Sequence, residues 1–206
     1  MKRIILTLVS IIAISLNVNA QIRYGVKVGA NIANQIIVPN ILQRTSLPLV
    51  AFHAGVVMEI PISKKVFFQP NLLFSQKGES FDFLNRRATL RNNYLDLPLN
   101  FGYKITPKLS VIGGPYLGYF INSSVGFVNS DSTFTTRIGS FVYGLNANIA
   151  YELNNGFVIG VNYSRGTIDG NGLSSKFTFL NNVWGFSLTK FITKAHPSEY
   201  YRKQDL

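Results

Sequence analysis

The chain has 206 residues, enough for one domain, and a formal net charge of +11. Charged residues make up 14% of the chain, against roughly 25% in an average soluble protein. There is no cysteine, which excludes disulfides, thiolate metal sites and a lipidated N-terminal cysteine. Beyond the first twenty residues, no window approaches the roughly 20 apolar residues that a helical membrane span needs. A membrane domain of this chain must therefore be built from strands.

The N-terminal segment has the pattern of a secretory signal peptide. A basic pair, Lys2-Arg3, precedes an apolar stretch over residues 4–16, and Val18-Asn19-Ala20 offers small residues for cleavage. The alternative is an uncleaved membrane anchor, but the apolar stretch is short and ends in a cleavable pattern. We expect residues 1–20 to be a signal peptide and the mature chain to begin at Gln21.

Beyond the signal peptide, apolar residues alternate with small polar residues, which is the period-two pattern of strands with two different faces. The pattern predicts eight strands, at residues 22–32, 52–60, 68–77, 95–104, 110–121, 141–152, 157–164 and 184–189. Gly113-Gly114-Pro115 weakens the fifth strand, because proline donates no ladder hydrogen bond. An even number of strands is what single-chain bacterial barrels have.

The connections between these strands alternate in length. Three are short turns rich in Pro, Asn and Gly, at residues 61–65, 105–108 and 154–156. Four are longer, near residues 34–49, 78–92, 123–138 and 169–181. Short periplasmic turns and long extracellular loops are typical of outer-membrane barrels. We therefore predict an all-β fold, an eight-stranded antiparallel up-and-down transmembrane β-barrel over residues 21–193, with both termini in the periplasm and a polar periplasmic tail at 194–206.

Alternation alone does not say which face lies outside, because a lipocalin-like barrel in water turns its apolar face inward around a ligand. A surface in water is rich in Lys and Glu, whereas the polar face here holds mainly Gly, Asn, Ser and Gln. Aromatic residues gather near strand ends, as two membrane-interface girdles require. We expect one girdle near the long loops, from Phe74, Tyr94, Tyr119, Phe141, Tyr143, Tyr163 and Trp184. The other lies near the short turns, from Tyr24, Phe67, Phe68, Tyr103, Tyr151, Phe157 and Phe191.

Four sequence blocks carry a family resemblance. They are GVKVGAN at residues 25–31, FQPNLLFSQKG at 68–78, NYLDLPL at 93–99 and GPYLG at 114–118. These blocks resemble the outer-membrane β-barrel family of Gram-negative bacteria that includes the PorT-like proteins. The resemblance implies a porin-like outer-membrane barrel, with some family members linked to assembly of a secretion system, and it implies no catalytic residues. The chain departs from many such barrels by continuing past Phe191.

Parity places a set of charged residues on the inward face, with His53 nearby. The set is Arg23, Lys27, Glu59, Lys77, Asp96, Lys104 and Glu152. By strand direction, Arg23, Glu59, Lys104 and Glu152 gather at the periplasmic mouth, and Lys77 and Asp96 lie on neighbouring strands near the outer mouth. The set forms either a functional feature, namely a proton or ion path or a gate, or a plug. We predict the plug, because an eight-stranded barrel is just wide enough for its own side chains to fill, and unpaired buried charges are costly.

Arg86, Arg87 and Arg91 lie in the second long loop, with Lys77 at its base. Guanidinium groups suit phosphate, so these three residues are candidates for binding the phosphates of lipopolysaccharide. The alternative is an ordinary solvated loop.

Catalytic chemistry finds little support in the sequence. A hydrolase would need a histidine near a serine and an acid, and the histidines are His53, on the inward face, and His196, in the tail. Metal sites need clustered His, Cys or carboxylates. The basic residues are scattered, without the basic helix or stacking platform that nucleic-acid binding favours. We expect no enzyme activity, no cofactor, no metal site and no nucleic-acid partner.

The sequence thus predicts a monomeric, non-enzymatic outer-membrane barrel with a structural role or a role in envelope or surface interactions. The expected partners are outer-membrane lipid, lipopolysaccharide and the outer-membrane assembly machinery. Two alternatives stay open. One is a narrow porin that passes small solutes, and the other, by family analogy, is an accessory factor of a protein secretion system.

Overall fold

The computed structural model describes residues 22–38, 46–83, 86–127, 133–136, 140–168 and 178–192. These residues form strands β1 (Arg23–Val38), β2 (Ser46–Leu47), β3 (Leu49–Pro61), β4 (Val66–Phe83), β5 (Arg86–Lys104), β6 (Leu109–Phe127), β7 (Thr133–Thr136), β8 (Ser140–Glu152), β9 (Phe157–Ile168) and β10 (Thr178–Phe191), with a 3-10 turn η1 (Asn154–Gly156). No helix in these ranges is long and apolar enough to cross a membrane. The predicted signal peptide (1–20) and tail (194–206) lie outside them.

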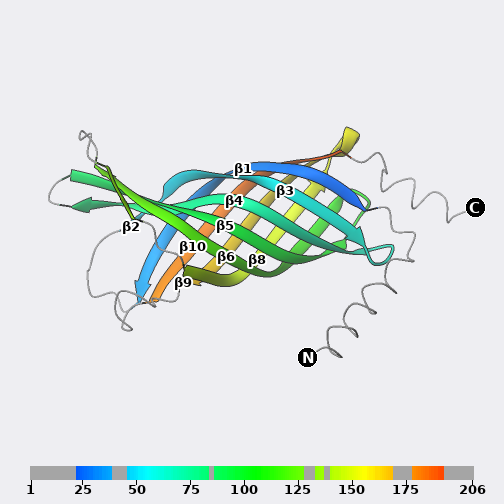
Figure 1. Ribbon diagram of the computed structural model, residues 1–206. Coiled ribbons are helices and arrows are strands. Elements are labelled where there is room, and N and C mark those ends of the chain that lie inside the picture. The colour runs from blue at the N-terminus through cyan, green and yellow to red at the C-terminus, as the bar shows by residue number, and fades with distance from the viewer. Residues whose placement is uncertain are drawn as a thin grey trace, which may run out of the picture.

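Eight of the strands close into a barrel (Figure 1). They pair antiparallel in the order β4-β3-β1-β10-β9-β8-β6-β5, and pairing of β5 with β4 closes the ring. The first and last barrel strands meet from Gly25–Phe191 to Val38–Thr178. Closure matters because backbone groups at a free sheet edge would have no hydrogen-bond partners in lipid. The predicted eight-stranded antiparallel up-and-down barrel is confirmed.

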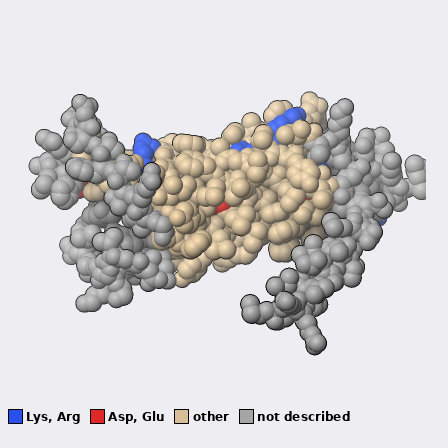
Figure 2. All heavy atoms as spheres, viewed as in Figure 1, with Lys and Arg blue, Asp and Glu red and all other residues tan. Residues whose placement is uncertain are grey.

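The apolar faces of the strands lie outside. Val28, for example, is 51% exposed, and Leu145 is 68% exposed. On the face seen in Figure 2, the barrel wall carries few charged side chains. Asparagines such as Asn31 and Asn100 are buried inside. The barrel therefore has the orientation suited to lipid, and the lipocalin-like arrangement is rejected.

The three predicted short turns are present at one end of the barrel, the short-turn end. Backbone N–H groups of Ile62, Ile105 and Leu153 donate to carbonyls four residues on, at 2.9, 2.9 and 2.7 Å. In the third turn, Asn155 and Gly156 have φ of 67° and 73°. Asn and Gly are the residues that adopt this left-handed conformation most readily.

At the opposite, long-loop end, two of the predicted loops are largely strand. β4 runs to Phe83 and β5 starts at Arg86, so most of the predicted loop 78–92 is a hairpin. β6 runs to Phe127 and pairs with β7, which replaces much of the predicted loop 123–138. β2 pairs with β4 on the other side. We call residues 46–47, 78–83, 86–93, 122–127 and 133–136 the protruding sheet, because β4, β5 and β6 extend past the other strands (Figure 1).

Three aromatic residues assigned to the outer girdles instead point inward. Tyr94, Phe67 and Phe191 are 0%, 2% and 5% exposed. Each has inward parity on its strand, and Tyr94, for example, is followed by the outward Leu95. Alternation along the strand therefore predicts the direction of a side chain better than its closeness to a strand end does. The girdle assignment of these three residues was wrong.

Candidate functional site: the charged interior of the barrel

Four charged residues meet inside the short-turn end. We call Arg23, Glu59, Lys104 and Glu152 the short-turn cluster. The Arg23 guanidinium lies between two carboxylates, with Nη2 2.9 Å from Glu59 Oε1 and Nη1 2.8 Å from Glu152 Oε1. Lys104 Nζ lies 3.6 Å from Glu59 Oε1. The four residues come from β1, β3, β5 and β8, so the cluster ties together strands from around the ring.

Two of the inward aromatic residues support this cluster. The Arg23 guanidinium lies 4.1 Å from the centre of the Phe191 ring, and Lys104 Nζ lies 5.6 Å from that of Phe67. A cation over a ring face is attracted by the ring's negative face, and more strongly where water is excluded. Phe191 and Phe67 therefore help to hold the two cations in place inside the short-turn end.

A second cluster lies nearer the long-loop end. Lys77 Nζ is 2.7 Å from Asp96 Oδ2, and both side chains are almost fully buried. The ammonium also lies 4.8 Å from the ring centres of Tyr94 and Tyr116. Tyr94 stacks on Phe120 at 4.9 Å. We call Lys77, Asp96, Tyr94, Tyr116 and Phe120 the long-loop cluster.

A chain of hydrogen bonds crosses the barrel beside the long-loop cluster. Gln35 Nε2 donates to Asn181 Oδ1 at 3.2 Å, and Asn181 Nδ2 donates to Tyr94 Oη at 3.3 Å. Asn181 lies on β10 and Tyr94 on β5, which are opposite strands in the ring of eight. The bond between them therefore spans the lumen. We call this arrangement the crossbar.

Glycines make room for these large interior groups. An added Cβ at Gly118 would lie 2.6 Å from Asp96 Oδ1. At Gly166 it would overlap the Tyr116 hydroxyl, and at Gly29 it would overlap the His53 ring. These glycines on the inward face therefore leave the space that large side chains need inside a narrow barrel.

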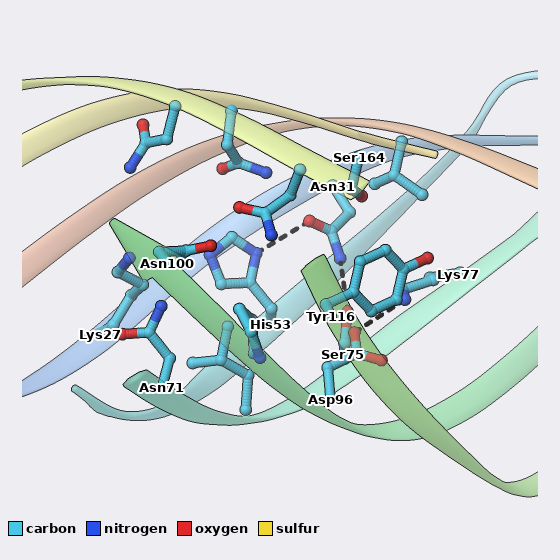
Figure 3. Close-up of a pocket in the computed structure, with 16 residues that line it drawn as sticks. Lys27, Asn31, His53, Asn71, Ser75, Lys77, Asp96, Asn100, Tyr116 and Ser164 are labelled. Carbon is cyan, nitrogen blue, oxygen red and sulfur yellow. Dashed lines mark hydrogen bonds and ion pairs between the residues drawn. The ribbon is translucent and has the colours of Figure 1, made fainter. Parts of the chain in front are cut away.

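A chamber lies between the two clusters, with a volume of about 60 Å³. Figure 3 shows Lys27, Asn71 and Asn100 on one side of it, Lys77 and Asp96 on the other, with His53 between. His53 Nδ1 lies 2.8 Å from Asn31 Oδ1. Among the described residues, His53 makes its polar contact with an amide, and His196 lies outside them.

The structure brings six of the seven predicted interior charges into the two clusters. Lys27 is separate, because it lines the chamber between them. Sequence reasoning missed Gln35 and Asn181, because they fall in the predicted loops 34–49 and 169–181. It placed Tyr116 on the inward face but did not predict its contact with Lys77.

The three predicted lipopolysaccharide contacts lie on a strand and not in a loop. Arg87 Nε is 3.4 Å from Asp82 Oδ1, and both side chains are more than half exposed. Arg91 Nη1 donates to Gln76 Oε1 at 3.0 Å. The Arg86 side chain lies outside the described part of the structure.

Comparisons with known proteins agree with this architecture. A family model described as outer membrane protein beta-barrel domain matches residues 17–169. The structure of Ail, the attachment invasion locus protein of Yersinia pestis, in complex with the heparin analogue sucrose octasulfate is similar, with a TM-score of 0.50 and 10% identity over 82% of this chain and 98% of that chain. Neisserial surface protein A has a TM-score of 0.48 and 12% identity, over 80% and 95% of the two chains.

No curated protein matches the sequence. The likeness to Ail supports the barrel fold and nothing further, because the identity is low. The family model, by contrast, covers well over half of the chain. This chain therefore belongs to the outer membrane protein beta-barrel domain family, whose members reside in the outer membrane.

Proposed function

We propose that this protein is a closed, non-enzymatic barrel that serves as a structural element or as a surface and envelope interaction module. The observation that carries the proposal is the filling of the lumen at two levels. Arg23 is held between two carboxylates at one level, and the Lys77–Asp96 pair lies beside the crossbar at the other. An eight-stranded barrel has little interior width to spare once such groups fill it.

The proposal includes an orientation. In outer-membrane barrels the short turns face the periplasm and the longer connections face outward. The first residue of β1 and the last residue of β10 both lie at the short-turn end, which supports a periplasmic location for both termini. The protruding sheet then extends from the cell surface, where it is available to partners. Export by a signal peptide at residues 1–20 and membership of the PorT-like group belong to the same proposal.

Conductance tests the closed barrel directly. Refolded protein inserted in planar bilayers is expected to give no steady single-channel current, because both clusters block the lumen. A variant with Arg23→Ala and Tyr94→Ala, which cuts a large side chain at each level, should conduct and serves as the positive control. Heat-dependent gel mobility verifies that each sample is folded. A steady current from the wild type would favour a narrow porin instead.

We also propose that the exposed arginines of the protruding sheet bind lipopolysaccharide phosphates. On the outer face of β5, Leu95 is the last apolar residue towards the long-loop end. The next outward residue, Asn93, belongs to a row of hydrogen-bonded polar side chains. In that row, Gln76 Nε2 donates to Asn93 Oδ1 at 3.1 Å, and Asn93 Nδ2 donates to Asn122 Oδ1 at 2.7 Å. Arg91 lies one outward position beyond Asn93 on β5 and donates a hydrogen bond to Gln76. We expect its guanidinium to lie at the level of the lipid headgroups.

Replacing Arg86, Arg87 and Arg91 with glutamine is expected to weaken lipopolysaccharide binding by about tenfold or more. A basic side chain near an anionic surface contributes about 1 kcal/mol, and about 1.4 kcal/mol corresponds to tenfold. Binding is measured as lipopolysaccharide retained through purification and by titration in detergent. Lys64→Gln, in an exposed short turn, is the matched control. Equal retention by the triple variant and the control would contradict this proposal.

A further inference from the structure

The chamber between the clusters contains a charge that the closed-barrel proposal leaves unexplained. Lys27 is 8% exposed, and its side chain lines both the chamber and a smaller cavity of about 20 Å³ beside the short-turn cluster. We propose that the chamber binds one small monovalent anion, the size of chloride, next to the Lys27 ammonium.

A count of interior charge motivates the site. Among the described residues of the barrel lumen, Arg23 and Lys104 balance Glu59 and Glu152, and Lys77 balances Asp96. No carboxylate within salt-bridge distance remains for Lys27 in the described residues. Glu79, the other buried carboxylate, has an interaction of its own and does not line the chamber. A buried charge without a partner is costly, so the lumen favours one added negative charge.

His53 does not supply that negative charge. Its Nδ1 points to Asn31 Oδ1, while Asn31 Nδ2 donates to the Gln76 carbonyl at 3.0 Å. The Asn31 amide is held in this orientation by its own donor bond, so its oxygen accepts and His53 Nδ1 carries a proton. The imidazole is therefore neutral or cationic, never an anion.

The walls of the chamber can provide donors for an anion. The side-chain oxygens of Asn71, Asn100 and Asn148 are buried and have no hydrogen-bond partner among the described residues. All three residues line the chamber, and the NH₂ group of an asparagine amide can donate two hydrogen bonds. Three amides and the Lys27 ammonium then surround the anion.

The dimensions of the chamber limit the ligand. About 60 Å³ holds roughly four water molecules, since one needs about 10–15 Å³ of such volume. A halide with water fits this volume, and a sugar phosphate or nucleotide does not. One unbalanced charge also favours a monovalent ion over a divalent one.

Anomalous diffraction from crystals of the full chain grown in bromide tests the site. We expect a bromide peak in contact with Lys27 Nζ in the wild type and in the control Lys64→Gln, and no such peak in Lys27→Met. Chamber density without an anomalous signal at Lys27 in the wild type would show water alone and overturn the proposal. This result from the wild type is decisive even if Lys27→Met does not fold.

Chloride-35 NMR provides the measurement in solution. Folded protein in zwitterionic detergent is expected to broaden the chloride signal, with at least twofold less excess broadening for Lys27→Met than for Lys64→Gln. Equal broadening by the two variants would place chloride elsewhere and overturn the site. Neither result depends on bilayer conductance, so this proposal and the closed-barrel proposal can fail separately.

Discussion

Replacing Arg23 with methionine is expected to lower the free energy of unfolding by about 3–5 kcal/mol, the usual cost of removing one partner from a buried ion pair. The change leaves the Glu59 and Glu152 carboxylates buried inside the short-turn end without the guanidinium that separates them. Lys104 reaches Glu59 at 3.6 Å and offsets part of one charge. Urea titration in lipid vesicles, followed by the fluorescence of Trp184, measures the loss.

Two comparison variants separate charge from packing. Arg23→Met combined with Glu59→Gln and Glu152→Gln removes the stranded carboxylates and should recover most of the lost stability. Arg87→Met breaks a pair whose members are both exposed, so it should cost less than about 1 kcal/mol. If the combined variant is as unstable as Arg23→Met, the guanidinium acts through its contact with Phe191 and not through its pairing with the two carboxylates.

Alternation along the chain predicts the barrel because each strand has two different surroundings. Outward residues such as Val28 are apolar because they face lipid, whereas inward residues such as Asn31 are polar. The two kinds of residue therefore alternate along each strand. The same parity identified Arg23, Glu59 and Glu152 as inward and placed them at one end. The direction of each strand and the positions of the short turns were sufficient to place these three residues at the same end.

The protruding sheet could not be predicted in the same way. Beyond the apolar belt, the outward face of β4 and β5 is polar, as in the Ser80–Thr89 and Asp82–Arg87 pairs, while Phe81 and Ala88 pair on the other face. Backbone pairing continues there, but the apolar residues now lie on the inward face. A prediction that follows outward apolar residues therefore places the strand ends too early.

The crossbar was missed for a different reason. Asn181 and Tyr94 are 87 residues apart in sequence and face each other across the ring. Asn181 falls in the predicted loop 169–181 and Tyr94 in the predicted outer girdle, and their meeting also depends on strand tilt and stagger, which alternation does not determine. Lys27 illustrates the same limit, because its inward position was predicted but its lack of a carboxylate partner was not.

Val28→Arg is expected to destabilise the barrel in lipid by about 2–4 kcal/mol, the cost of an arginine on the lipid face at the bilayer midplane. Val28 is outward and lies halfway along β1 between Tyr24, near the short-turn end, and Ile32, which pairs with Trp184. Arginine at Tyr24, near the interface, should cost only about 0–1 kcal/mol.

Val28→Leu, which keeps the surface apolar, is the control for shape at this position. All three variants are compared by urea titration in vesicles of one lipid composition. If arginine costs as little at Val28 as at Tyr24, the midplane does not cross β1 at Val28, and the membrane then lies at another height along the barrel. A graded cost fixes the height of the hydrocarbon layer, and with it the distance by which Arg91 and the protruding sheet extend beyond the lipid.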